Sequence, residues 1–309
     1  MNTTIANWLA ETIQRDRFVL SDGATGTELQ RRGFELPAPL WSAAAITEAP
    51  QLLQNIHQDY LKAGAQILTA NTFRTTPHVL RQSGQEHAAV ELTQKAIAIA
   101  QQAIQSESYD AKLAVSIAPL EDCYSPDRVP NAAILAEDHA RFVQILSQCE
   151  FDFVLLETQI NLTECSIAAD LLHQNQIPFA LSCVTHPADP TALLSGEKLT
   201  DLWNNVLPLQ PLWVGVNCVC LEQVPAILKC WKTYSRQHLS SPVRFGIYCN
   251  SHRMLANGQW ESSQGESAEG YMEQAQSWLD QDVAIIGGCC GTTPTYTQQL
   301  KTLQFPNSI

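Results

Sequence analysis

The chain is poor in positive charge and has no long apolar run. Lysine and arginine together number 18 against 31 acidic residues, so the formal net charge is −13. A nucleic-acid backbone would be repelled, which excludes a nucleic-acid partner. No stretch is long enough to cross a bilayer, and the N-terminal MNTTIANWLAETIQRDRF lacks the uninterrupted apolar core of a signal peptide. We therefore expect a cytoplasmic protein with no membrane partner.

The composition is that of a globular protein with a sizeable core. Of the 309 residues, 45% are hydrophobic and 16% are charged. No segment rich in proline, glycine or serine divides the chain, so we expect one domain over residues 1–309, with insertions at 185–196 and 257–269. Ten cysteines in a reducing compartment are more often thiols or metal ligands than disulfides. The sequence does not indicate the oligomeric state.

Eight short apolar runs alternate with helical patterns. The runs end near Ala24, Phe73, Pro119, Thr158, Val184, Cys218, Asn250 and Cys290. Each is nearly continuous, as expected for parallel strands buried on both faces. Amphipathic segments lie between them, for example the one that starts at Pro50 and stops before Gly64. Eight such units in this length predict a TIM-type (β/α)8 barrel, with a doubly wound open sheet as the alternative.

Unusual polar residues gather at the ends of the predicted strands. They are Asp22, Asn71, Glu157, Cys218, Asn250, Cys289 and Cys290. In a barrel of this kind all of these strand ends open on the face where active sites are built. We therefore expect residues that are far apart in the sequence to converge there.

The vicinal cysteines Cys289 and Cys290 indicate a metal site. Glycines on both sides let the backbone leave the strand conformation, so that both thiols can face one point. Cys218 ends the sixth run and can supply a third thiolate, with Cys220 as its competitor. Three thiolates and one open position are typical of catalytic zinc. The alternatives are a redox pair and buried core thiols. We assign the other cysteines to packing: Cys123, Cys149, Cys165, Cys183, Cys230 and Cys249.

A turn follows the first apolar run, in SDGATGTELQRRG. Thr25 and Glu28 are spaced as a capping box, and Gly33 can end the short helix. Free backbone N–H groups at such a start attract an anion, for example a carboxylate. We predict that Gly23, Ala24 and Thr25 bind one, although a structural turn explains the sequence equally well.

Two carboxylates stand at the ends of apolar runs. Asp22 can receive an ammonium group, and Glu157, which closes FVLLE, requires a cation because burying a lone charge is costly. Only 18 lysines and arginines serve the whole chain, which favours a ligand amine as that cation. With the turn, these acids describe a pocket for a zwitterionic amino acid, and next to zinc that amino acid should carry a thiol.

Two ring side chains have competing explanations. Trp41, in PLWSAAAITEAP, can hold a methyl donor with a positive sulfonium or ammonium, or it can simply pack. His57 lies on an apolar helix face, and we expect a core histidine whose hydrogen bonds are satisfied.

Five motifs resemble one known family. They are SDGATGTEL at 21–29, ANTF at 70–73, LLET at 155–158, GVNC at 215–218 and GGCCGTTP at 287–294. They resemble the homocysteine S-methyltransferases, zinc-dependent barrels related to betaine-homocysteine methyltransferase and to the homocysteine domain of cobalamin-dependent methionine synthase. The resemblance implies that Cys218, Cys289 and Cys290 bind Zn2+, and that Asp22, Gly23 and Glu157 hold the amino acid part of homocysteine. It also implies that Asn250 touches the substrate or fills the fourth zinc position.

The resemblance also implies methyl transfer to homocysteine from a small cationic donor, which gives methionine. The chain has no room for folate and cobalamin modules and lacks the long C-terminal extension of betaine-dependent relatives. By elimination we favour S-methylmethionine, with S-adenosylmethionine second. A betaine-type donor stays open, because Trp41 suits either cation. Two other classes also stay open: a zinc-binding or thiol-binding sensor or carrier, and a redox enzyme that uses Cys289 and Cys290.

Overall fold

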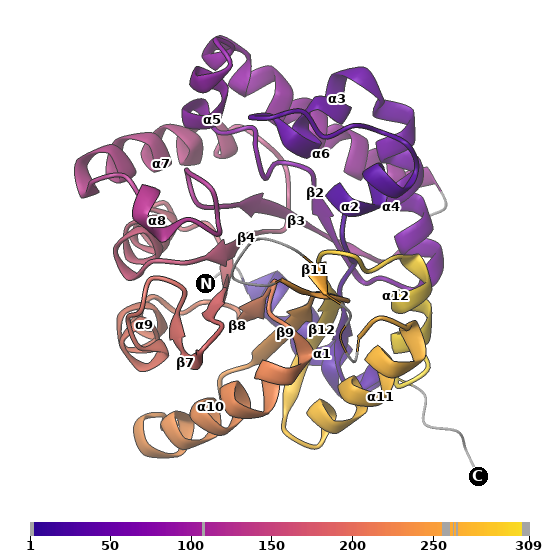
Figure 1. Ribbon diagram of the computed structural model, residues 1–309, viewed down its shortest axis with the longest axis vertical. Helices are drawn as coiled ribbons and strands as arrows, with labels where there is room; N and C mark the ends of the chain where they lie inside the picture. Colours follow the sequence, from indigo (N-terminus) through magenta and orange to yellow (C-terminus); the bar gives the residue numbers. More distant parts are fainter. Residues whose placement is uncertain (1–2, 107–108, 255–259, 262, 264, 305–309) are drawn as a thin grey trace.

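Eight parallel strands form one sheet that curls into a barrel (Figure 1). The computed structural model describes all residues except 1–2, 107–108, 255–259, 262, 264 and 305–309. The barrel strands are β1 Val19–Leu20, β2 Ile67–Ala70, β3 Lys112–Ile117, β4 Phe153–Gln159, β5 Phe179–Cys183, β8 Val214–Asn217, β9 Phe245–Cys249 and β12 Val283–Gly288. They pair in the order β1-β12-β9-β8-β5-β4-β3-β2. A parallel bridge between Ser21 and Ile67 joins the two outer strands and closes the ring.

The predicted strands and barrel are confirmed, and the alternative of an open sheet is wrong. Each of the eight apolar runs contains one barrel strand. Two short antiparallel hairpins are additional: β6 Thr185–His186 with β7 Asp189–Leu193, and β10 Arg253–Met254 with β11 Trp260–Glu261. The first hairpin lies in the insertion predicted at 185–196. The insertion predicted at 257–269 includes residues outside the described part of the chain.

Helices surround the strands (Figure 1). The α-helices are α1 Thr3–Asp16, α2 Gly26–Arg31, α3 Ala45–Glu48, α4 Pro50–Ala63, α5 Pro77–Gln82, α6 Ala89–Ser106, α7 Ala132–Leu146, α8 Leu162–Gln174, α9 Leu199–Val206, α10 Val224–His238, α11 Ala268–Leu279 and α12 Pro294–Lys301. Short 3-10 turns are η1 Trp41–Ala44, η2 Glu86–Ala88, η3 Pro126–Arg128, η4 Leu207–Leu209 and η5 Leu221–Gln223. Helix α4 ends as predicted, because Gly64 has φ 109° and takes the left-handed conformation that stops a helix.

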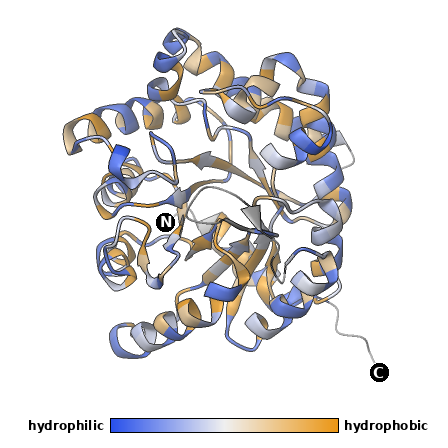
Figure 2. Ribbon diagram, in the orientation of Figure 1, coloured by the Kyte–Doolittle hydropathy of each residue, from blue (hydrophilic) through white to orange (hydrophobic). Residues whose placement is uncertain are grey.

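The strands separate two apolar layers. One set of strand residues, such as Leu68 and Leu156, packs outward against the helices. The alternate set, including Phe153, fills the barrel together with Trp213, which precedes β8, and these two rings lie 5.1 Å apart edge to face. Figure 2 shows the apolar strands at the centre and mixed polar and apolar helices around them. Burial of both strand faces explains why each strand reads as a continuous apolar run.

Helix α1 contributes to the inner layer from outside the barrel repeat. Its side chains Ile5 and Leu9 are buried in the same cluster as the inward-facing strand residues. The cavity described below lies at the other end, where the strands finish. Among the described residues, no helix has the length and apolar character needed to span a membrane.

Candidate active site

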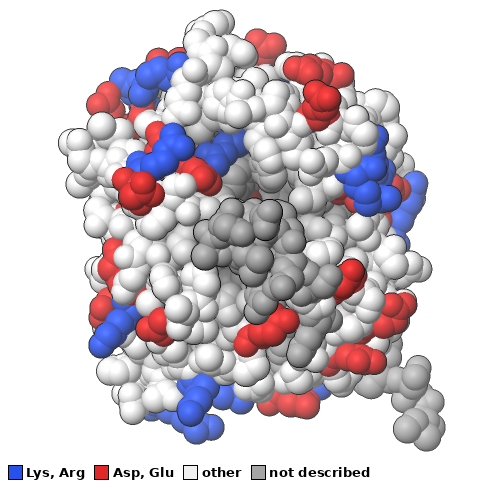
Figure 3. All heavy atoms as spheres, in the orientation of Figure 1, with Lys and Arg blue, Asp and Glu red and all other residues white. Residues whose placement is uncertain are grey.

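A cavity of about 710 Å³ opens at the carboxyl ends of the strands. Figure 3 shows a hollow near the centre of this face, with acidic and basic side chains on its rim. Nine of the ten predicted site residues line the cavity: Asp22, Gly23, Ala24, Thr25, Trp41, Glu157, Cys218, Cys289 and Cys290. Glu157 lies in β4, Trp41 begins η1, and the others directly follow β1, β8 and β12, so the convergence expected of a barrel is present.

Three thiols meet in this cavity. The Sγ atoms of Cys218, Cys289 and Cys290 all lie within 4.8 Å of one another. Cys220 is not part of the group, because its thiol contacts the Gln223 side-chain oxygen at 3.3 Å. Of the two candidates on the sixth predicted strand, the structure therefore selects Cys218. The assignment of Cys123 to packing is incomplete, because this residue also lines the cavity.

Backbone strain turns side chains into the cavity. Cys218 follows the last residue of β8 and has φ 54°, a left-handed conformation that is unfavourable for a residue with a Cβ atom. Thr158, at φ 52°, and Trp41, at φ 48°, also line the cavity. Such strain persists where the surroundings enforce it and is concentrated at functional sites. Here it turns Cys218 out of the strand alternation and toward the other two thiols.

The glycines around the vicinal cysteines have packing roles as well as conformational ones. Gly291 has φ 81°, and its N–H donates to the Thr27 hydroxyl at 2.9 Å. A Cβ atom on Gly288 would lie 2.3 Å from the Thr292 hydroxyl oxygen. This Thr292 hydroxyl donates to the Cys289 carbonyl at 2.8 Å, which fixes the turn that carries both thiols.

The three thiols share their protons unequally. Hydrogen bonds from the thiols of Cys218 and Cys289 lower the pKa of Cys290 well below that of a free cysteine. Hydrogen bonds with the thiols of Cys289 and Cys290, together with burial, raise the pKa of Cys218 well above its ordinary value. The Asn217 amide adds a further donor, with its nitrogen 3.7 Å from the Cys218 sulfur and 4.0 Å from that of Cys289. The three sulfur atoms and the Asn217 amide therefore form one compact polar cluster.

A soft divalent metal fits this donor set. The three sulfur atoms are close enough for one ion to contact all of them, and thiolates select soft metals over magnesium or calcium. Among the described residues, no other three His, Cys, Asp or Glu side chains converge in this way. The Asn250 Oδ1 atom is buried without a hydrogen-bond partner among the described residues, while the Asn250 amide nitrogen donates to the Cys218 carbonyl at 3.1 Å. Asn250 does not line the cavity, so its contact with metal or substrate stays a prediction.

The two predicted carboxylates both lack a cation among the described residues. Asp22 accepts from the Thr69 N–H at 2.7 Å and from the hydroxyls of Thr69 and Ser21. Burial nevertheless raises the pKa of Asp22 to about 6. Glu157 accepts a hydrogen bond from the Ser116 hydroxyl, and burial raises the pKa of Glu157 to about 8. Each acid is therefore prepared for a positively charged ligand group.

The capping box predicted in the first turn is wrong. Thr25 has helical backbone angles and makes no side-chain cap, whereas Glu28 forms ion pairs with Arg31 and Arg32, both at 2.7 Å. These arginines hold Glu28 more strongly than a backbone N–H would. The helix end is as predicted, because Gly33 has φ 89°. The Gly23 and Thr25 N–H groups make no hydrogen bond to a described residue, so they are available to a ligand.

Two predicted ring residues have different outcomes. Trp41 lines the cavity beside Phe73, with ring centroids 5.6 Å apart, and a Cβ atom on Gly26 would lie 2.4 Å from the Trp41 ring. His57 is a core residue as predicted, but both of its ring nitrogens are buried without a hydrogen-bond partner among the described residues. Burial lowers the pKa of His57 to about 4. The expectation that its hydrogen bonds are satisfied is therefore wrong.

The sequence did not single out several residues of the cavity and its wall. Asn217 touches two of the thiols, Ser116 binds Glu157, and Arg74 and Tyr124 line the cavity. The Tyr124 hydroxyl is buried without a partner among the described residues. Only Asn217 had a usable signal, since it precedes Cys218 at a strand end. The others depend on which neighbouring loops meet.

Comparison with known proteins gives consistent results. Residues 19–303 match the family described as Homocysteine S-methyltransferase. The homocysteine S-methyltransferase of Escherichia coli strain K12 is 29% identical over 319 residues, covering 96% of this chain and 98% of that protein. Homocysteine S-methyltransferase 3 of Arabidopsis thaliana is 28% identical over 318 residues, covering 90% and 87%.

A solved structure agrees as well. The crystal structure of the homocysteine methyltransferase MmuM from Escherichia coli, in its metallated form, superposes with a TM-score of 0.78 at 27% identity. The match covers 95% of this chain and 99% of that chain. The barrel and the resemblance drawn from the five sequence motifs are both confirmed.

Proposed function

Because the chain belongs to the homocysteine S-methyltransferase family, we propose that it methylates the thiol of homocysteine in this cavity and so forms methionine. One observation carries the proposal: three clustered thiols and two carboxylates without a described cation open into the same cavity. The thiols suit a soft metal, and the carboxylates suit a ligand ammonium group. Residues 1–309 would act together as one homocysteine-binding barrel.

We infer that zinc is the metal, held by Cys218, Cys289 and Cys290. A bound zinc ion would lower the pKa of a thiol that coordinates it and would thereby supply a thiolate nucleophile at neutral pH. The likeness to a metallated relative supports this assignment. Asn217 would orient two of the ligands, because its amide lies against both sulfurs.

The amino acid part of homocysteine would bind beside the thiols. Its ammonium group would pair with Asp22 and Glu157, which supplies a cation to two acids that have none among the described residues. Its carboxylate would accept from the Gly23 and Thr25 N–H groups, which make no hydrogen bond to a described residue. Holding both charged groups fixes the direction of the side chain and brings its sulfur to the three cysteines.

S-methylmethionine is the donor that we favour, with S-adenosylmethionine second. The homocysteine sulfur forms a bond to the methyl carbon while the methyl–sulfur bond of the donor breaks, and the electron pair of that bond stays on the donor sulfur. A positive sulfonium and a negative thiolate thereby neutralise each other in the transition state. The faces of Trp41 and Phe73 offer a place for the onium group, and a betaine-type donor would use the same faces.

The test combines metal content with turnover. The protein is purified under reducing conditions, its zinc is quantified, and methionine formation from homocysteine is followed with S-methylmethionine, S-adenosylmethionine and betaine in parallel. Cys290→Ser is expected to lose both zinc and turnover. The matched control is Cys220→Ser, which makes the same change outside the cluster and should retain both.

The outcomes separate the candidate functions. About one zinc per chain with turnover on one donor supports the proposal and identifies that donor. Zinc and homocysteine binding without turnover on any donor would favour a sensor or carrier. Activity in a protein free of zinc would refute the metal assignment.

A further inference from the structure

The cavity wall carries an arginine that the homocysteine pocket does not use. Arg74 follows β2 and lines the cavity. One guanidinium nitrogen donates to the Glu121 backbone carbonyl at 3.0 Å, and the guanidinium carbon lies 5.0 Å from the centre of the Phe73 ring. No carboxylate of the described residues lies within ion-pair distance of Arg74. The Arg74 guanidinium is therefore held in position, with no carboxylate of the described part of the chain to balance its charge.

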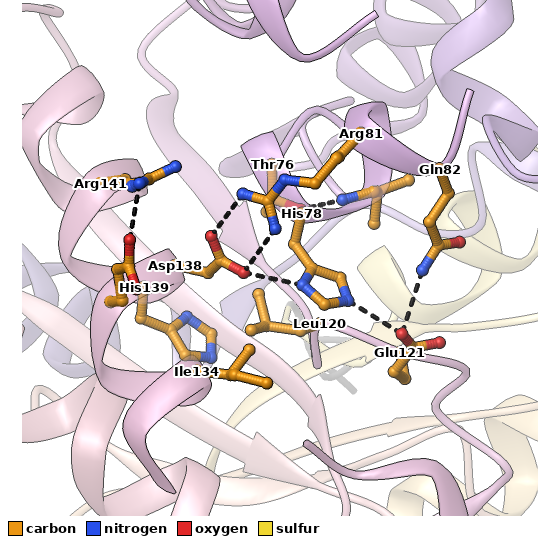
Figure 4. A network of polar contacts seen from close by, with 12 residues as sticks. Thr76, His78, Arg81, Gln82, Leu120, Glu121, Ile134, Asp138, His139 and Arg141 are labelled. Atoms are coloured by element: carbon orange, nitrogen blue, oxygen red, sulfur yellow. Dashed lines mark hydrogen bonds and ion pairs between the residues drawn. The ribbon is translucent and has the colours of Figure 1, made fainter. Parts of the chain in front are cut away.

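The side chain of Glu121, whose carbonyl accepts from this arginine, is already engaged. Glu121 accepts from Gln82 at 3.0 Å and from Arg128 at 3.2 Å, and it lies 2.8 Å from the His78 Nε2 atom. The other ring nitrogen of His78 lies 2.8 Å from Asp138 (Figure 4). This network fixes the loop after β3 by its side chains. The backbone carbonyl of Glu121 takes no part in this side-chain network and accepts the hydrogen bond from Arg74.

The next acid along the loop is engaged as well. Asp122 accepts from the Tyr124 N–H at 3.1 Å and from the Ser125 hydroxyl at 2.8 Å. It stabilises its own turn, as aspartates in such loops commonly do. Neither loop carboxylate therefore neutralises Arg74, although both line the same cavity.

The charges of the cavity thus fall into two separate sets. Asp22 and Glu157 lack a described cation, and the proposed homocysteine ammonium supplies it. Arg74 has no ion pair with a described residue, whereas the homocysteine carboxylate already has the N–H groups of the first turn. Arg74 lies against Phe73, and Phe73 packs beside Trp41. An anion at Arg74 would therefore belong to the molecule whose positive group lies on those two rings.

We propose that Arg74 binds the carboxylate of the methyl donor and selects small zwitterionic onium carboxylates. This inference rests on the proposed function and adds a determinant of donor specificity. The planar guanidinium can bind a carboxylate through two parallel hydrogen bonds, and stacking on an aromatic face limits its rotation. The carboxylate does not change during methyl transfer. Its bond to Arg74 is equally strong in substrate and transition state, so it acts on the donor KM more than on kcat.

The test pairs a change in the protein with the matching change in the donor. Turnover is measured with S-methylmethionine and with its amide, which keeps the sulfonium and amino groups but has no carboxylate. Arg74→Gln is expected to lower kcat/KM for S-methylmethionine by roughly 10- to 100-fold, the value of one charged hydrogen-bonded contact. The same variant should change kcat/KM for the amide by less than about 3-fold, since that contact is already absent.

Two controls limit the interpretation. Arg15→Gln removes the same charge from α1, away from the cavity lining, and should leave both donors unaffected. The homocysteine KM and the zinc content of Arg74→Gln should equal those of the wild-type protein. Equal losses on both donors would overturn the assignment, and so would a raised homocysteine KM with an unchanged donor KM.

A binding measurement keeps this inference separate from the proposed function. Isothermal titration of S-methylmethionine into the zinc-loaded protein is compared between the wild type and Arg74→Gln. If the wild type binds it at least 10-fold more tightly, the assignment holds even when no methyl transfer is detected. If the two proteins do not differ in affinity, the assignment fails whatever the enzyme does.

Discussion

Glu157→Gln should remove a loss of folding stability that the wild-type protein without ligand shows as the pH rises. Burial raises the pKa of the Glu157 carboxyl to about 8, from an ordinary value of 4.5. Between these values the unfolded chain loses its proton and the folded protein without ligand keeps it. Unfolding therefore releases a proton, and this group lowers the free energy of unfolding as the pH rises through that window. The slope is about 1.4 kcal/mol per pH unit.

The variant has no proton to lose at this position. The difference in the free energy of unfolding between wild type and Glu157→Gln should therefore shift by about 3 kcal/mol in favour of the variant between pH 5 and pH 7.5. Urea unfolding of the metal-free, reduced proteins, followed by circular dichroism at both pH values, measures this shift. Glu11→Gln, which removes one exposed acidic side chain, is the control for the loss of charge.

Homocysteine should remove this loss of stability in the wild-type protein and should have no such effect in Glu157→Gln. Its ammonium group supplies the missing cation, so binding near pH 7 should ionise Glu157 and release close to one proton from this carboxyl, in addition to the proton that the thiol loses to zinc. Titration calorimetry in two buffers of different ionisation enthalpy counts that proton. Glu157→Gln should bind homocysteine at least 10-fold more weakly and release about one proton fewer than the wild type, because the thiol proton lost to zinc is common to both proteins. Parallel stability profiles, or equal proton release by the wild type and the variant, would refute this account of Glu157.

Two further predictions concern residues away from the substrate ammonium. Asn217→Ala should weaken zinc binding by roughly 10- to 100-fold in a chelator competition. The Asn217 amide nitrogen contacts the sulfurs of Cys218 and Cys289, and its oxygen accepts from the Thr158 N–H. An unchanged zinc affinity would contradict this role of Asn217. His57→Leu should remove a loss of stability of about 2 to 3 kcal/mol that the wild type shows from pH 6.5 to pH 4.5. That loss arises because burial lowers the pKa of His57 to about 4, so only the unfolded chain takes up the proton; equal acid sensitivity in urea unfolding would show that the ring is not the cause.

The strands and the barrel could be predicted from the sequence because their causes are local. A parallel strand covered on both faces needs a nearly continuous apolar run, and all eight runs contain a strand. The breaks between them are local as well, as the left-handed Gly64 after α4 shows. Barrel topology then carries the ends of all strands to one face, so the meeting of Cys218 with Cys289 and Cys290 followed from their positions at strand ends.

The tertiary structure decided which partner each polar side chain found. The spacing of Thr25 and Glu28 satisfied the capping pattern, yet Arg31 and Arg32 bind Glu28 instead. The periodicity of α4 placed His57 in the core, but it gave no information on whether a hydrogen-bond partner would reach its ring.

The role that we propose for Arg74 is the clearest case of one that the sequence did not reveal. Nothing in the sequence around Arg74 distinguishes this residue from a surface arginine. Its place on the cavity wall depends on the loop after β3, whose Glu121 supplies a carbonyl but not its carboxylate. Secondary structure depends on the conformational preferences of a few neighbouring residues, so the sequence by itself determined the strands and helices. The pairing of charges depends on contacts between segments far apart in the chain, and only the folded barrel determines those.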